Sequence, residues 1–305
     1  MESVVVDGVR ISFERAGSGP VVVLVGGTGM PPVAWQLSGL CSELVKAGFE
    51  VVTYAARGVA PSDAPPAPYA MADLAGDLAG LMDHLEVRDA AVVGYSLGSF
   101  TAELLARLRP DLVGALVLMA GAGPLTGVVD AVLEAEAELI ALLGHLPPTF
   151  AALQTLLSTL APSVLRDDAE QVAAWRELLG SQERVWASPD GEAGQSAASL
   201  GWLRDADRMT ALAHIPVHTS VVAFEHDLYF PPHTGQAAAD VLPRGELTVI
   251  AGAAHGGLLT HPAETASAVL HFLTNVRTAI PSCPARYSTA PHGPASGSLP
   301  RKRPT

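Results

Sequence analysis

Five residues about a third of the way along the chain, Gly94-Tyr95-Ser96-Leu97-Gly98, constrain the fold more than any other feature. They stand between an apolar run that is typical of a strand, residues 90–95, and a stretch with helical periodicity, residues 97–109. A strand-to-helix turn this tight forces its central residue into a strained backbone conformation, and the flanking glycines let neighbouring segments approach closely. We therefore expect the Ser96 hydroxyl to project from the C-terminal edge of a sheet, where the helix dipole favours negative charge.

Segments on both sides of this turn alternate between strand-like and helix-like patterns. Asp7-Gly8 is a strong tight-turn pair and predicts a hairpin between residues 4–6 and 9–13. Strands that alternate with helices over short connections predict an α/β fold, with a mostly parallel sheet and helices on both faces. Further strands are predicted at residues 21–25, 50–54, 90–95, 112–119, 217–224 and 246–250, and helices at 33–47, 71–85, 97–109, 233–242 and 262–276.

Two stretches depart from this alternation. Residues 124–213 are rich in Ala and Leu, carry helical periodicity and contain no convincing strand, which indicates a helical insertion. Residues 281–305 are rich in Pro, Ser and Ala and lack the apolar content that a packed core needs, so we predict a disordered tail. The expected organisation is a core of residues 1–123 and 214–280, a helical cap of residues 124–213 and that tail.

Charge and composition exclude several classes of protein. The formal net charge is −13, and Glu264 is the last acidic residue, so the chain up to that point is still more acidic. An acidic surface argues against nucleic acid and anionic membranes as partners. Two cysteines, Cys41 and Cys283, argue against a disulfide-rich scaffold and a cysteine-based zinc site. Since Met1-Glu2 does not resemble a signal peptide, a cytoplasmic location is predicted.

A serine hydroxyl is a poor nucleophile near neutral pH and needs a neighbouring base. His255 is the candidate, because it lies among small residues after a strand and before the last helix. The base needs an acid to orient it, and Asp227, which follows strand 217–224, is favoured over its competitor Glu225. The alternatives without a catalytic role are that His255 is an ordinary loop histidine and that Asp227 is a solvated turn carboxylate.

The negative charge that forms on a substrate oxygen needs two N–H donors. The backbone N–H of Leu97, directly after the serine, is one candidate. The other is expected from the loop after strand 21–25, where Thr28 is assigned and Gly27 and Gly29 stay open as alternatives. A phosphate-binding glycine loop is disfavoured, because neither a lysine nor a helix-opening Gly-x-x-Gly pattern follows.

These residues together resemble the α/β-hydrolase superfamily over about residues 3–276, in its branch with a serine nucleophile and a helical cap. Gly94 to Gly98 is similar to the nucleophile elbow, and His255 followed by His261-Pro262 is similar to the C-terminal block. Arg57-Gly58-x-x-x-Ser62-Asp63 resembles the family's R-G-x-G-x-S-D loop, with Ala60 where the second glycine usually stands. Gly26-Gly27 stands where the family often has His-Gly.

The resemblance implies the α/β-hydrolase fold and a hydrolase that needs no cofactor and no metal. The expected reaction is cleavage of an ester, lactone or thioester of an apolar small molecule, through an acyl-enzyme and the triad Ser96, Asp227 and His255. The same triad also serves C–C hydrolases, cofactor-free peroxidase-like enzymes and cyclases, and a fourth alternative is a binding module that has kept the fold. Gly27, Tyr95 and Trp202 are the candidate substrate contacts, although a helical core explains the tryptophan equally well. The oligomeric state is left open, with a homodimer as the candidate.

Overall fold

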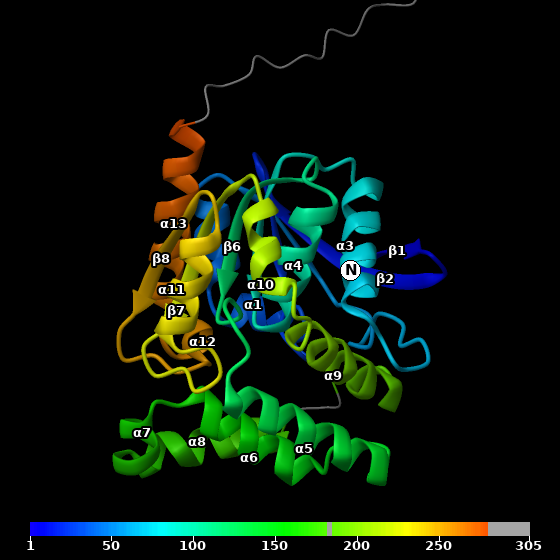
Figure 1. The fold of residues 1–305 in the computed structure, drawn as a ribbon, viewed down its shortest axis with the longest axis vertical. Coiled ribbons are helices and arrows are strands. Elements are labelled where there is room, and N and C mark those ends of the chain that lie inside the picture. The colour runs from blue at the N-terminus through cyan, green and yellow to red at the C-terminus, as the bar shows by residue number, and fades with distance from the viewer. Residues whose placement is uncertain (182–184, 280–305) are drawn as a thin grey trace, which may run out of the picture.

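An eight-stranded sheet forms the centre of the computed structural model, which describes residues 1–181 and 185–279 (Figure 1). Its strands are Glu2–Val6 (β1), Val9–Gly17 (β2), Val21–Val25 (β3), Glu50–Tyr54 (β4), Ala90–Tyr95 (β5), Val113–Met119 (β6), His218–Phe224 (β7) and Gly245–Ile250 (β8). The spatial order is β1-β2-β4-β3-β5-β6-β7-β8. β2 pairs antiparallel with β1 and β4, and all other neighbouring strands run parallel. Every predicted strand is present, so the expected mostly parallel sheet is confirmed.

Helices cover both faces of the sheet because successive side chains of a strand point to opposite sides. In β3, Val23 and Val25 belong to a buried apolar cluster that also contains residues of α3 and α4, whereas Val22 and Leu24 belong to a cluster with residues of α2 and α13. The helices of this α/β part are Val33–Leu37 (α1), Leu40–Lys46 (α2), Met71–His84 (α3), Leu97–Leu108 (α4), Pro232–Val241 (α11), Gly257–Thr260 (α12) and Pro262–Ala279 (α13).

The prediction of one helix over residues 33–47 is wrong, because α1 and α2 are separate. Gly39 adopts a φ of 75°, in the left-handed region that breaks a right-handed helix and that glycine enters at little cost. The Ser38 hydroxyl satisfies the backbone at the break: it donates to the Trp35 carbonyl and accepts from the N–H of Leu40. The serine-glycine pair thus turns the chain within two residues.

The inserted segment is helical, as predicted. Figure 1 shows α5 to α8 as a separate layer at one end of the molecule, with α9 between this layer and the α/β part. α9 contacts α5 on one side and α3 and α4 on the other. The division into core and cap stays a prediction, and the predicted tail lies outside the described residues. The helices are Gly127–Leu143 (α5), Pro148–Thr159 (α6), Pro162–Asp167 (α7), Ala169–Ser181 (α8), Pro189–Leu203 (α9) and Arg208–Ala211 (α10), followed by a 3-10 turn at Leu212–His214.

A short antiparallel bridge ties the segment before α9 to the loop after β4. Val59 pairs with Trp186, the N–H of Ala60 donates to the Val185 carbonyl at 2.8 Å, and the N–H of Ala187 donates to the Gly58 carbonyl at 2.9 Å. These bonds join two parts of the chain that lie more than 120 residues apart. The start of α9 is therefore fixed directly to the α/β part.

Two glycines make this contact close. A Cβ at Gly58 would lie 2.7 Å from the Cα of Gly191, and Gly58 also has a φ of +91°. A Cβ at Gly191 would in turn overlap with the backbone of Gly58. Only residues without side chains fit at both positions, so the backbones of the loop and of α9 touch.

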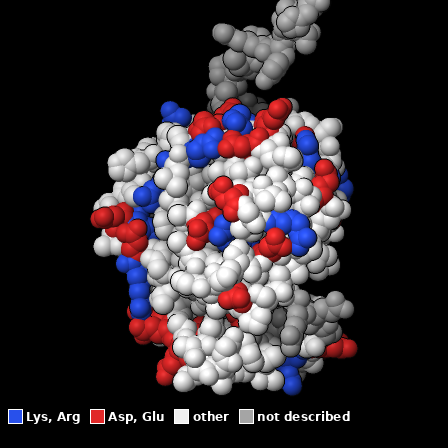
Figure 2. Space-filling view, turned by 90° about the vertical axis from the view of Figure 1, so that its right-hand side faces the viewer, with Lys and Arg blue, Asp and Glu red and all other residues white. Residues whose placement is uncertain are grey.

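Charged side chains of both signs lie close together on the face drawn in Figure 2. Among the described ion pairs, Arg109 binds both Asp83 and Asp111, and Arg204 binds Asp130 and Glu134. These pairs partly neutralise exposed arginines. None of the helices in the described ranges combines the length and apolar character that a membrane crossing needs.

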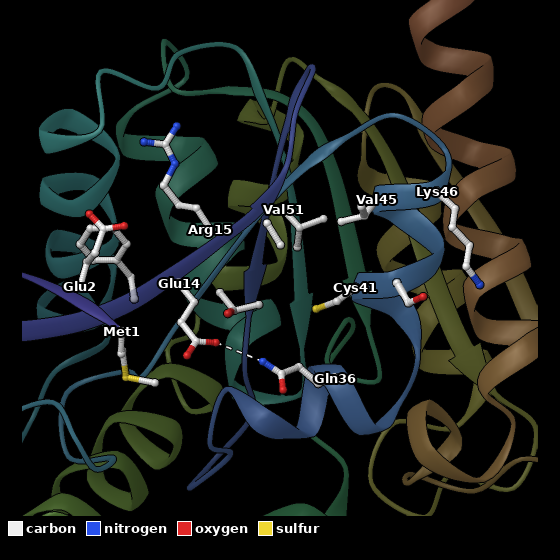
Figure 3. A pocket seen from close by; sticks show the side chains of 13 residues that line it. Met1, Glu2, Glu14, Arg15, Gln36, Cys41, Val45, Lys46 and Val51 are labelled. Atoms are coloured by element: carbon white, nitrogen blue, oxygen red, sulfur yellow. Dashed lines mark hydrogen bonds between the residues drawn. The ribbon is translucent and has the colours of Figure 1, made fainter.

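A surface pocket of about 580 Å³ lies beside β2, β4 and α2 (Figure 3). Its lining includes Cys41 and Lys46, and a hydrogen bond of 3.1 Å joins Gln36 to Glu14 within it. Burial raises the pKa of the Cys41 thiol to about 11, which favours the protonated thiol at neutral pH. The pocket contains none of the predicted site residues.

Candidate active site

Ser96 occupies the strained turn that the sequence predicted between β5 and α4. Its φ of 52° and ψ of −120° lie in a region that residues with a side chain rarely adopt, at a cost of about 1–3 kcal/mol. A Cβ at Gly94 would overlap with the Gly98 carbonyl, and a Cβ at Gly98 would overlap with the Val25 carbonyl. Both glycines are therefore required by the close approach of neighbouring backbone.

Strand β6 supports the turn from one side. The N–H of Ser96 donates to the Met119 carbonyl at 2.9 Å. The Ser99 hydroxyl, which is fully buried, lies 2.9 Å from the carbonyls of both Gly94 and Met119. These bonds satisfy the backbone around the serine and fix its position against the sheet.

The structure brings together the three residues that were assigned to the triad. The Nε2 atom of His255 lies 3.2 Å from the Ser96 hydroxyl, and the Nδ1 atom lies 2.8 Å from Oδ2 of Asp227. With Nδ1 protonated, the imidazole donates to the carboxylate and its Nε2 lone pair accepts the serine proton. This is the geometry that lets a histidine act as a base toward serine.

Asp227 is held by its own loop. Its side chain is fully buried, and Oδ1 accepts from the N–H groups of Tyr229 and Phe230 at 2.8 and 3.0 Å. Glu225, the competing acid, points elsewhere and accepts from the N–H of Gly252 at 2.7 Å. The geometry thus favours Asp227 over Glu225 as the partner of the histidine.

The loop of His255 is held from two further sides. The Tyr95 hydroxyl donates to the His255 carbonyl at 2.8 Å, and the N–H of His255 donates to the Ser158 carbonyl at the end of α6 at 3.1 Å. Burial raises the pKa of Tyr95 well above its ordinary value, so the phenol stays protonated and remains a donor. A Cβ at Gly256 would overlap with the side chain of Thr159, so α6 rests directly on this loop. The predicted contact of Tyr95 with substrate stays a prediction.

The two predicted N–H donors lie on either side of the serine. Leu97 is the first residue of α4, where a helix leaves its N–H groups without intrahelical partners. A Cβ at Gly27 would lie 3.2 Å from both the Ser96 Cβ and the Tyr95 ring, so the loop after β3 passes directly beside the nucleophile. Thr28 follows and is exposed, and its N–H makes no hydrogen bond to a described residue.

Trp202 lies in the interface between α9 and α4. It is 7% exposed and belongs to an apolar cluster with Phe100. The guanidinium carbons of Arg107 and Arg208 lie 5.6 and 5.9 Å from its ring. These contacts are those of a core residue, and a role of Trp202 in substrate binding stays a prediction.

A chain of polar side chains leads from the inserted helices to the triad. The Gln154 amide donates to the Glu136 carboxylate at 2.6 Å and lies 3.4 Å from the Tyr229 hydroxyl. The Tyr229 ring meets the His255 ring edge to face, with 5.0 Å between their centres. Burial raises the pKa of Glu136 above its ordinary value. The helices above the triad therefore carry hydrogen-bonding groups as well as apolar side chains.

Sequence reasoning missed Glu136, Gln154, Tyr229 and Gln195. Tyr229 stands two residues after Asp227, and this nearness was the one available signal. Glu136 is one of several acidic residues on an amphipathic helix, and Gln195 lies in an Ala-, Gly- and Ser-rich stretch. Neither stretch has a pattern that separates a site residue from its neighbours.

Comparisons with known proteins agree with this fold. The sequence model of the family described as alpha/beta hydrolase fold matches residues 19–262. A protein named as a non-heme bromoperoxidase, BpoC, from Mycobacterium tuberculosis is 29% identical over 88% of this chain and 99% of its own length. Its crystal structure aligns with a TM-score of 0.79, covering 90% of this chain and 98% of that one.

Other relatives carry different names. A 2-hydroxymuconate semialdehyde hydrolase from Pseudomonas sp. strain CF600 is 26% identical over 88% of this chain and 92% of its own length. A thermophilic esterase from Thermogutta terrifontis is 25% identical, with a TM-score of 0.74 over 90% of this chain and 99% of that one. The relatives thus share one fold but are named for more than one reaction.

Proposed function

The chain belongs to the α/β-hydrolase family, and we propose that it is a serine hydrolase that cleaves an ester, lactone or thioester of a small molecule. The observation that carries this proposal is the continuous hydrogen-bonded chain from Ser96 through His255 to Asp227. A strained serine at a helix N-terminus, with a base in reach and a buried acid behind the base, fits acyl transfer.

In the proposed reaction, the Ser96 oxygen attacks the substrate carbonyl while His255 Nε2 takes the hydroxyl proton. Asp227 stays ionised and stabilises the imidazolium. The oxyanion of the tetrahedral intermediate accepts from the N–H groups of Leu97 and Thr28. His255 then returns the proton to the leaving group, which departs and leaves an acyl-enzyme. Water, deprotonated by the same histidine, attacks the carbonyl of the acyl-enzyme, and the histidine returns this proton to the Ser96 oxygen as the acid is released.

The polar chain of Glu136, Gln154 and Tyr229 supports a substrate that carries a hydrogen-bonding group in addition to an apolar body. Tyr229 contacts the catalytic imidazole, so such a group would lie close to the reacting carbonyl. A site whose polar side chains hydrogen-bond the correct substrate rejects an analogue that lacks the matching group.

Cleavage of a C–C bond next to a carbonyl is the second candidate, and the same polar chain favours it. In that reaction the leaving group is a carbanion, which is released as an enolate whose oxygen needs hydrogen-bond donors. The Tyr229 hydroxyl, which accepts from Gln154, would be placed to supply one. The relative named 2-hydroxymuconate semialdehyde hydrolase makes this candidate worth testing alongside ester cleavage.

Replacement of Ser96 by alanine tests the common part of both candidates. Turnover of a short p-nitrophenyl ester should fall by at least about 10³-fold, because no other group can form the acyl-enzyme. Ser96→Ala should also abolish labelling by a fluorophosphonate probe. Retained turnover in pure Ser96→Ala protein would contradict the proposal. Activity assays then distinguish the candidate reactions. Their substrates are lactones, thioesters, β-diketones, and esters to which hydrogen peroxide is added.

A further inference from the structure

Gln195 links the loop beside the nucleophile to the rest of the molecule, although it lies in the inserted segment on α9. Its side chain is fully buried. Its Oε1 accepts from the N–H of Gly29 at 2.9 Å, and its Nε2 donates to the Arg57 carbonyl at 2.9 Å. Both ends of the amide are thus used, and a buried amide that lost either partner would carry an unsatisfied polar group.

Arg57, to which Gln195 donates, is itself held by an ion pair. The Arg57 guanidinium forms two hydrogen bonds of 2.6 and 2.7 Å to Asp77, whose side chain is 2% exposed. Trp186 holds the same loop from another direction, since a Cβ at Gly29 would lie 2.9 Å from its ring. A chain of contacts therefore runs from α3 through Arg57 and Gln195 to Gly29.

The backbone N–H groups of Gly27, Thr28 and Gly29 differ in their hydrogen bonding. The N–H of Gly27 points to the Met30 sulfur at 3.4 Å, and Met30 closes the turn by donating to the Gly27 carbonyl at 3.1 Å. The N–H of Gly29 is taken by Gln195. Thr28, between them, is the residue whose N–H makes no hydrogen bond to a described residue.

We propose that Gln195 is a positioning residue, which fixes Gly29 so that the Thr28 N–H stays free and aimed at the developing oxyanion. This inference rests on the proposed acyl-transfer function. It also resolves the choice among Gly27, Thr28 and Gly29, because Gly29 cannot donate to substrate while it donates to Gln195. The inserted segment thereby takes part in the chemistry through the loop, without touching the substrate.

The competing explanation is that Gln195 merely attaches α9 to the α/β part. Asp190 provides a matched control, because its Oδ1 accepts from the N–H of Ala67 at 3.1 Å and attaches the same helix at a different loop. A purely structural tether predicts similar effects for both residues. A positioning role predicts a catalytic effect for Gln195 alone.

The test compares Gln195→Met, which keeps the length of the side chain, with Asp190→Ala. For Gln195→Met we expect kcat to fall about 10- to 100-fold, less than for complete loss of an oxyanion donor, with KM within about threefold. The affinity of an alkyl boronic acid, which forms a tetrahedral adduct on serine, should fall with kcat. The pH profile of kcat/KM should keep its shape, because the triad is intact. Equal losses of kcat in both variants, or a loss confined to KM, would overturn the proposal.

Amide hydrogen exchange of the unmodified protein gives a second test that does not depend on a variant folding. The Gly29 amide should exchange slowly and the Thr28 amide quickly, and the boronic acid should protect Thr28. Fast exchange at Gly29 would refute the role of Gln195, whatever the activity. Slow exchange at Gly29 with no boronate adduct and no fluorophosphonate labelling would instead refute the proposed acyl transfer, and the positioning role with it.

Discussion

Asp227 is fully buried, and each of its hydrogen bonds is one in which the carboxylate accepts. The donors are Nδ1 of His255 and the N–H groups of Tyr229 and Phe230. Backbone N–H groups cannot reverse their direction, so Oδ1 is held as an acceptor and Oδ2 is left to face the imidazole. A carboxylate in this position accepts from Nδ1–H of His255, and that tautomer leaves Nε2 free to accept from Ser96.

Replacing Asp227 by asparagine should remove the preference for the His255 tautomer that has Nδ1 protonated. If the new amide oxygen faces the backbone N–H groups, its NH2 group faces the imidazole and favours the tautomer with Nε2 protonated, which cannot accept the serine proton. We expect kcat for a p-nitrophenyl ester to fall by about 10⁴-fold with little change in KM. Glu225→Gln is the matched control and should stay within about threefold of the wild type. An Asp227→Asn enzyme that keeps a tenth of its kcat would contradict the assignment.

The meeting of Ser96, Asp227 and His255 could be predicted from the sequence because each follows the end of a recognisable strand within five residues. The C-terminal ends of parallel strands meet at one edge, so order along the chain sufficed to place Ser96, Asp227 and His255 together. Gln195 lies 166 residues from Gly29 and shares no pattern with it. Such a contact depends on how an irregular loop packs against a helix. The periodicity of the sequence does not predict that packing.

At the scale of elements, α5 and α6 place a carboxyl group in a poorly hydrated position above the triad. Glu136 accepts from Gln154, but burial outweighs this bond and raises the pKa of Glu136. The folded protein therefore binds the Glu136 proton more tightly than the unfolded chain does. The stability that this proton provides is present below the unfolded pKa and is lost as pH rises through the folded pKa.

Glu136→Gln should remove this pH dependence while its amide oxygen still accepts from Gln154. We expect the melting temperature of the variant to exceed that of the wild type at pH 8 and the difference to vanish near pH 4. Thermal unfolding followed by circular dichroism at both pH values measures it. Glu134→Gln, on the exposed side of the same helix, should show no such gain. A Glu136→Gln variant less stable than the wild type at pH 8 would show that the charged form is favoured.

The strands were predictable as elements because they are short runs of β-branched residues between turn signals. The break between α1 and α2 was not, since apolar spacing continues through it and only Gly39 marks the change of direction. A glycine inside a helical pattern is tolerated often enough that its presence does not by itself predict a break. The contacts of α2 with β4 and α13 are tertiary, and apolar spacing along the chain does not show them.

At the scale of the whole molecule, a buried arginine lies where the chain returns from the inserted helices to the α/β part. Arg208 of α10 is 2% exposed and donates to the Gly123 carbonyl at 2.6 Å and to Glu103 of α4 at 2.9 Å. Its guanidinium carbon also lies 5.2 Å from the Phe100 ring. The start and the end of the insertion are thus joined through one side chain, against the helix that carries Leu97 at its N-terminus.

Replacing only one member of the Arg208–Glu103 pair should lower the free energy of unfolding far more than replacing both. Glu103→Leu leaves the arginine charge buried without its partner, and we expect a loss of about 3–5 kcal/mol in the free energy of unfolding, measured with urea. Glu103→Leu with Arg208→Met should lose less than the single variant. Asp83→Ala, which breaks an exposed pair with Arg109, should cost less than about 1 kcal/mol. A double variant less stable than Glu103→Leu would mean that the arginine stabilises through its carbonyl contacts alone.

The backbone contact of Gly58 with Gly191 limits how this enzyme could be recombined with its relatives. A chimera that carried the inserted helices of another member of the family would need a residue without a side chain opposite Gly58. It would also need an amide opposite Gly29. Inserted helices that lack these two features would have to be exchanged together with residues 26–30 and 57–60, the two loops that they contact.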